Sequence, residues 1–160
     1  MPRIIAIDPG KNGALVAMTE TEVIEIIDIP HHVPFGTKPI VDVCMVRNFL
    51  IKHDPDFVIL ESVWTMPTDG KASGASLVRS WGCLYGATAG CDVRFVYPSK
   101  WKAYAGLIRM AKAASVPRAL RFYPTAGPLI EGFKNEIDRA DAVLIGHYGL
   151  FEDRVKRGKR

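Results

Sequence analysis

Residues 3–13 have the sequence RIIAIDPGKNG, and the fold prediction starts from this stretch. The β-branched apolar run of residues 4–7 is typical of a buried strand. Pro9 to Gly13 follows as a turn, and its Asn-Gly pair indicates a hairpin to the next strand. Asp8 stands where strand and turn meet, and a carboxylate beside a buried strand is costly unless something offsets it. We therefore predict a strand that delivers an acidic side chain at its carboxyl end.

The elements that follow are read from hydrophobic periodicity and turn residues. Strands are predicted over residues 14–19, 22–29, 57–60 and 93–97, helices over about 41–53, about 73–89 and much of the chain after 97, and loops over 30–39 and 62–71. In the first helix, Val43, Val46, Phe49 and Leu50 share one face. Three antiparallel strands followed by alternating helices and strands indicate an α/β fold. We expect a five-stranded mixed sheet, antiparallel and then parallel, flanked by helices on both faces.

The length of 160 residues fits one domain, predicted over residues 1–150 with a basic tail at 151–160. The net charge of +4 and the isoelectric point near 9.0 favour an anionic partner without identifying it. No apolar run reaches the ~18 residues of a membrane span, so no membrane association is expected. Arg3 and Asp8 interrupt the short apolar start, so no signal peptide is expected.

The three cysteines, Cys44, Cys83 and Cys91, have no CxxC spacing. We interpret them as reduced core residues of a cytoplasmic protein rather than as zinc ligands. His147 is interpreted as a packed residue rather than a ligand.

Three further acids accompany Asp8. Glu61 ends the apolar run of residues 57–60, and Asp138 and Asp141 have the i, i+3 spacing that places both on one helix face. Each acid alone also fits a turn or a cap, since Asp-Pro-Gly is a good turn by itself. Together they would repel one another unless cations bind or their pKa values rise. Magnesium suits an all-oxygen site, and two such ions can clamp a phosphodiester, so the pattern indicates a nuclease.

Four blocks resemble the RuvC-type Holliday-junction resolvases of the RNase H-like superfamily, and the short phage-encoded branch most of all. They are IAIDPGKNG at 5–13 with Ile4 before it, VILES at 58–62, YPSKWK at 97–102 and DRADAV at 138–143. The resemblance covers residues 3–150. It implies an RNase H-like fold and assigns Asp8, Glu61, Asp138 and Asp141 as catalytic metal ligands. It also implies that Lys102 and Lys112 act near the scissile phosphate, with Lys100 competing for the role of Lys102.

The resemblance further implies the reaction. Such a protein would act as a homodimer in a bacterial or phage-infected cell, binding a four-way DNA junction and nicking two strands symmetrically. Two Mg²⁺ ions per site, replaceable by Mn²⁺, would activate water, and the products would carry a 5′-phosphate and a 3′-hydroxyl. Gly82 and Gly86 in the long helix of residues 73–89, and Gly90 just after it, repeat every fourth residue, and this small-residue stripe predicts a close approach to the sheet or to a second protomer.

Two regions are candidates for binding DNA. The loop after Glu61 contains Trp64, Met66 and Lys71, and the first two could wedge against unstacked bases or simply pack under the loop. The basic segment of residues 154–160 could act as a flexible arm that attracts phosphates, or be a solvated end.

Alternatives from other classes stay open. An actin-like ATP-binding fold uses a similar acid-and-turn strand but needs two lobes and a longer chain. A junction-binding module without catalysis would not need all four acids. Among nucleases, an enzyme for flaps and forks or an RNase H-like enzyme is the runner-up.

Overall fold

The computed structural model describes residues 1–10, 12–34, 38–63 and 71–158, and for residues 71–73 it describes the backbone alone. A five-stranded mixed sheet forms its centre, with strand order β3-β2-β1-β6-β7. The strands are β1 (Ile4–Ile7), β2 (Ala14–Met18), β3 (Val23–Asp28), β6 (Phe57–Glu61) and β7 (Val93–Val96). β1, β2 and β3 pair antiparallel, whereas β1, β6 and β7 pair parallel. The predicted fold class is confirmed.

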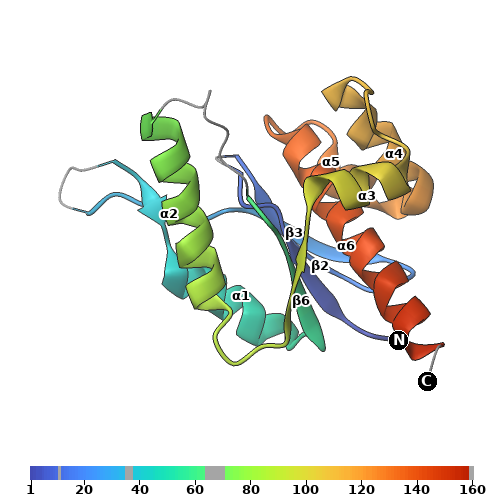
Figure 1. The fold of residues 1–160 in the computed structure, drawn as a ribbon, viewed down its shortest axis with the longest axis horizontal. Coiled ribbons are helices and arrows are strands. Elements are labelled where there is room, and N and C mark those ends of the chain that lie inside the picture. Colours follow the sequence, from blue (N-terminus) through green and yellow to red (C-terminus); the bar gives the residue numbers. More distant parts are fainter. Residues whose placement is uncertain (11, 35–37, 64–70, 159–160) are drawn as a thin grey trace.

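Helices cover both faces of this sheet (Figure 1). On one face lie α1 (Val43–His53) and α2 (Lys71–Ala87). On the other lie α3 (Pro98–Ala105), α4 (Ser115–Phe122), α5 (Gly127–Ile130) and the long α6 (Glu136–Arg157), with the short 3-10 turns η2 (Lys112–Ala114) and η3 (Pro124–Ala126) between them.

β1 is buried on both faces because its side chains alternate between two cores. Ile4 and Ala6 belong to the core beneath α6, and Ile5 and Ile7 belong to the core beneath α1 and α2. A central strand of this kind must be apolar throughout, which explains the continuous β-branched run. The polar residue that follows it marks the edge of the sheet.

Two glycines let α6 lie close against the sheet. A Cβ added at Gly149 would come within 2.6 Å of Ile59 Cδ1, and one added at Gly146 would collide with the thioether of Met18 and approach Ala6 Cβ to 3.0 Å. Interiors are packed too densely to take such an addition without a shift. These contacts bring α6 over β1, β2 and β6.

Several sequence predictions need correction. The predicted loop of residues 30–39 contains β4 (His31–His32), which pairs antiparallel with β5 (Ile40–Val41). Cys44 is exposed and Cys83 and Cys91 are half-buried, so the prediction of core cysteines is wrong for Cys44. Val43 is exposed, unlike Val46, Phe49 and Leu50, which are buried as predicted.

The chain end also differs from the flexible arm that its charge suggested. α6 continues to Arg157, whose Nε lies 2.7 Å from Asp153 Oδ2, so residues 154–157 are helical. The boundary at residue 150 stays a prediction. Within the described residues, no helix combines the length and the apolar character needed to span a membrane.

Candidate active site

Asp8 and Glu61 lie side by side at the carboxyl edge of the sheet. Ile7 pairs with Leu60 in the parallel β1–β6 ladder, so the next residue on each strand falls at the same level. The turn after β1 then fixes Asp8. Its amide donates to the carbonyl of Ala14 (3.0 Å), and its Oδ1 accepts the Gly10 amide (3.0 Å). Asp8 is only 8% exposed, so this carboxylate is held in a largely dry position.

Two tryptophans, from helices on opposite faces of the sheet, hydrogen-bond to Glu61. Trp101 of α3 donates its indole N–H to Glu61 Oε1 at 2.7 Å, and Trp81 of α2 donates to the Glu61 backbone carbonyl at 2.9 Å. An indole N–H can only donate a hydrogen bond, so each tryptophan fixes the position of a Glu61 oxygen. Sequence reasoning missed both residues. Trp101 adjoins Lys102 in the YPSKWK block, and that position is the signal that could have found it.

Asp138 and Asp141 reach the site because α6 is anchored at its first turn. Asn135 Nδ2 donates to Asp28 Oδ1 (2.8 Å) and to the carbonyl of Asn12 (3.1 Å). Arg139 Nε donates to the same Asp28 oxygen at 2.8 Å. These bonds tie the start of α6 to the end of β3 and to the β1–β2 turn. The two acids therefore face the sheet edge that carries Asp8.

The four carboxyl groups perturb one another. Burial, followed by the charge of Glu61, raises the pKa of Asp8 to about 8, although the Gly10 amide opposes the shift. Burial is also the main cause that raises the pKa of Glu61, of Asp138 and of Asp141. The charge of Asp141 adds to the increase at both Asp8 and Glu61. Such a cluster favours the binding of protons or cations, because desolvated like charges repel one another.

Two lysines face this acidic cluster. The charge of Lys102 on α3 acts to lower the pKa of Glu61 and of Asp141, and that of Lys112 in η2 acts to lower the pKa of Asp138 and of Asp141. Lys100 is exposed in the first turn of α3 and is not among the groups that shift these pKa values. The charge of Lys102, and not that of Lys100, therefore acts on the acids. Ser115, which sequence reasoning missed, hydrogen-bonds the Asp141 carboxyl, and it follows Lys112 by three residues.

One oxygen of this cluster lacks a partner. Asp141 Oδ1 is buried and accepts no hydrogen bond within the described structure. Such an orphan is costly and requires an explanation, of which a bound ion is one. Among the described residues, however, no three acidic, histidine or cysteine side chains converge closely enough to enclose a metal ion. The carboxylates are therefore neighbours in space whose side chains do not close around one point.

The remaining sequence candidates have no described position. Trp64 and Met66 lie outside the described residues, and so does the side chain of Lys71. Their proposed contacts with DNA stay predictions.

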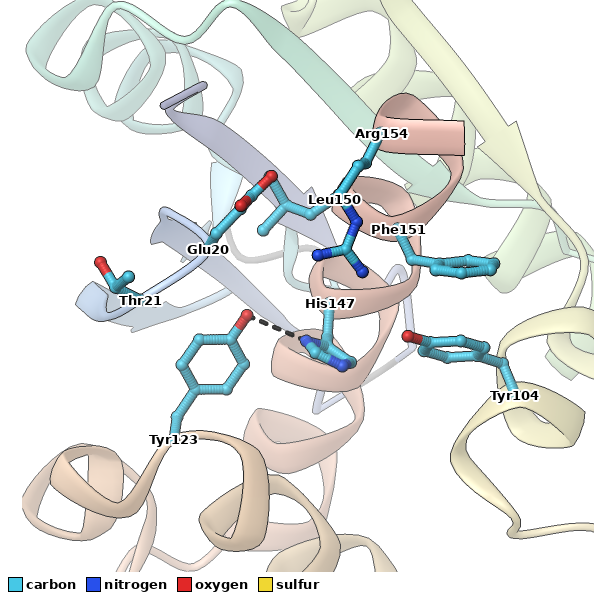
Figure 2. A pocket seen from close by; sticks show the side chains of 8 residues that line it. All are labelled: Glu20, Thr21, Tyr104, Tyr123, His147, Leu150, Phe151 and Arg154. Carbon is cyan, nitrogen blue, oxygen red and sulfur yellow. Dashed lines mark hydrogen bonds between the residues drawn. The ribbon is translucent and has the colours of Figure 1, made fainter. Parts of the chain in front are cut away.

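A separate pocket of about 160 Å³ lies farther along α6, and none of the four acids lines it (Figure 2). His147 is one of the residues that line it. Its Nδ1 lies 3.1 Å from the Tyr123 hydroxyl, and its ring stacks on Phe122 at 4.1 Å. Burial lowers the pKa of His147, and the charge of Arg154 adds to this. His147 is thus a packed residue, as predicted.

The fold is that of known junction resolvases. Thermus thermophilus RuvC, solved in complex with a Holliday junction substrate, superposes with a TM-score of 0.73 at 17% identity, covering 97% of this chain and 96% of that one. A second structure of Thermus thermophilus RuvC gives a TM-score of 0.66 at 18% identity, covering 96% of each chain. The yeast mitochondrial Holliday junction resolvase Ydc2 gives 0.65 at 12% identity, covering 98% of this chain and 81% of that one. No protein-family model and no curated protein sequence matches the chain.

Proposed function

We propose that the chain is a metal-dependent endonuclease that resolves four-way DNA junctions. One observation supports it above the others: four carboxyl groups from β1, β6 and α6 gather at one sheet edge with raised pKa values, opposite two lysines. The fold likeness to two junction resolvases agrees with this substrate. The acids are assigned as the catalytic and metal-binding residues, and Lys102 and Lys112 as their partners at the phosphate.

The acids fit a divalent cation. Their oxygen donors are those that Mg²⁺ and Mn²⁺ prefer, and the unpartnered Asp141 Oδ1 is a ligand atom without another role. Asp8, Glu61, Asp138 and Asp141 would hold the ions, two per site, after their side chains rotate toward a common point. When bound, such ions activate water and neutralise charge on the phosphate.

The residues of the chain have separable tasks in phosphodiester hydrolysis. Water adds its oxygen to phosphorus, and the P–O3′ bond breaks, so the products are a 5′-phosphate and a 3′-hydroxyl that receives a proton. Trp101 keeps Glu61 oriented through its 2.7 Å hydrogen bond. Lys102 and Lys112 place positive charge where negative charge develops on the phosphate oxygens, and fixed charge of this kind lowers the barrier.

Cleavage of a substrate panel tests the proposal. End-labelled four-way junction, fork, flap, duplex and RNA–DNA hybrid are incubated with the protein and Mg²⁺ or Mn²⁺. We expect paired, symmetric nicks in the junction that a ligase can seal, and at least tenfold slower cutting of duplex. Faster cutting of flaps or of the hybrid would select the runner-up nucleases instead. Junction binding without cleavage under either metal would select the non-catalytic module.

A symmetric pair of nicks requires two sites, and we propose that a homodimer supplies them through α2 and β7. Trp81, Tyr85 and Phe95 form a ring cluster with centroids 5.4–5.8 Å apart, and Tyr85 and Phe95 are about half exposed. Beside them, a Cβ added at Gly86 would meet nothing within 4 Å. The small-residue stripe therefore does not approach the sheet of its own protomer. An exposed aromatic surface of this kind is typical of an interface.

Replacing Gly86 with glutamate tests the proposed dimer interface. In an isolated protomer the change should raise stability by about 0.5–1 kcal/mol, because glycine is a poor residue in a helix interior. In a dimer it would bury a charge, so sedimentation should show monomers where the parent protein shows dimers. Met45→Glu, at an exposed position of α1, is the control and should leave the mass unchanged. Equal masses for all three proteins would exclude this face as the interface.

A further inference from the structure

Residues 106–111 connect α3 to η2, and both of these elements carry a lysine of the candidate active site. Lys102 precedes this segment and Lys112 follows it, and the charges of both lysines act on the carboxyl group of Asp141. The α3 helix ends at Ala105 and is capped by Gly106, and the Leu107 amide donates to the Lys102 carbonyl at 2.8 Å. The segment therefore connects the two lysines that act on the acids.

Its tip is a tight turn with an unexpected residue in it. The Met110 amide donates to the Leu107 carbonyl at 3.1 Å, which closes a four-residue turn anchored by the buried Leu107. Arg109 occupies the third position with φ of 62°, in the left-handed region. Turns of this geometry strongly favour glycine there, since a Cβ strains the backbone. Folding alone would thus be better served by glycine than by arginine.

Three side chains of this turn, those of Ile108, Arg109 and Met110, project into solvent in the described protomer. Arg109 is exposed and forms no ion pair or hydrogen bond in the described part of the chain. Ile108 is 50% and Met110 58% exposed, so two apolar side chains flank the cation in solvent. Asp54, the other described non-glycine residue with positive φ, differs because it caps α1 through its amide bond to the Leu50 carbonyl. A strained backbone that no contact of its side chain explains indicates a functional role.

We propose that this turn is a DNA-binding element for the strand next to the scissile phosphate. Arg109 binds a backbone phosphate, and Ile108 and Met110 pack against the adjoining sugars and base faces. The charge of the segment supports DNA as the occupant, because the turn with the exposed Arg109 connects Lys102 to Lys112, whose charges act on the acids. A planar guanidinium is well suited to two phosphate oxygens. This inference rests on the proposed function.

The test separates folding from binding. Arg109→Gly should keep or raise the thermal midpoint Tm, because glycine relieves the backbone. It should weaken binding of a synthetic four-way junction three- to tenfold at 50–100 mM KCl, measured in Ca²⁺ to prevent cleavage. The slope of log K against log[KCl] should fall by about one, since one phosphate contact is lost. Arg121→Ala, at an exposed position in the last turn of α4, is the control and should leave the slope unchanged.

Met110→Ser distinguishes the apolar part of the contact. It should weaken junction binding a few-fold with the same salt slope as the parent protein, because no charge is removed. If the parent protein cuts junctions while Arg109→Gly matches it in affinity and slope, the turn does not bind DNA and the proposed function stands. A fall in Tm together with affinity would make Arg109 a structural residue and equally overturn the inference. If the parent protein neither binds nor cuts branched DNA, the proposed function itself fails.

Discussion

Asp8→Asn should abolish junction cleavage, with a rate loss of at least about 10³-fold, while junction binding is retained. The Asp8 carboxylate is the most buried of the four acids, and asparagine removes its negative charge from the group that would hold the divalent cations. Asparagine keeps an oxygen that can accept the Gly10 amide, which preserves the turn. Cleavage rate and junction affinity, measured on the same preparation, check both parts. Cleavage at a normal rate would remove Asp8 from the catalytic residues.

The same variant should be more stable than the parent protein in the absence of metal. The folded-state pKa of Asp8 is about 8, above its ordinary value of 3.8. Between these values the unfolded chain binds fewer protons than the folded one, so the parent protein loses stability as pH rises from about 4 to 8. Asparagine cannot ionise, so the variant should gain several °C in Tm at pH 8 and nothing below pH 4. Added Mg²⁺ should raise the Tm of the parent protein at pH 8 more than that of the variant. A variant less stable than the parent at pH 8 would mean that Asp8 supports folding.

Gly13→Ala should disrupt the site more than a substitution at any other glycine whose surroundings the structure describes. An added Cβ would collide with the backbone carbonyl of Asp8 and come within 2.9 Å of the Gly10 amide nitrogen. Backbone atoms cannot move aside without opening the turn that positions Asp8. We expect a loss of about 3 kcal/mol or more in unfolding free energy, the upper end of overpacking costs, and a loss of cleavage.

Two other substitutions provide a scale for that loss when unfolding free energies are measured by chemical denaturation. Gly10→Ala lies in the same turn, but its Cβ would come only to 3.3 Å from Asp8 Oδ1, so its cost should be below about 1 kcal/mol. Gly146→Ala collides mainly with the flexible thioether of Met18, so its cost should fall between the two. Equal costs for Gly10→Ala and Gly13→Ala would show that the turn adapts.

The strand-end acids were predictable because their signals are local. An apolar strand followed by a polar residue marks the sheet edge, and β1 and β6 each show it, so the placement of Asp8 and Glu61 needed no other part of the chain. The two-residue strands β4 and β5 were missed because each is too short to show a period, and their pairing spans the chain between His32 and Ile40. Val43 was wrongly predicted to lie on the buried face, because helical periodicity does not show which turns of the helix contact the rest of the protein.

The supporting residues of the site could not be predicted for a similar reason. Trp81 and Trp101 come from helices on opposite faces of the sheet and meet only at Glu61. Asp28 anchors Arg139 across more than a hundred residues of sequence. No local pattern encodes such pairs, because each depends on how whole elements pack.

The sequence by itself determined the sheet, the helices and the two acids at strand ends, since period and turn chemistry act over a few residues. Only the tertiary structure decided that α6 brings Asp138 and Asp141 to the same edge, that the charge of Lys102 rather than Lys100 acts on the acids, and that Arg109 is held in a strained turn between Lys102 and Lys112. These outcomes depend on docking, which Gly146, Gly149 and the bonds to Asp28 make possible. These features could not be predicted from the sequence because they depend on how distant elements pack, through dense contacts and buried charges that no local pattern encodes.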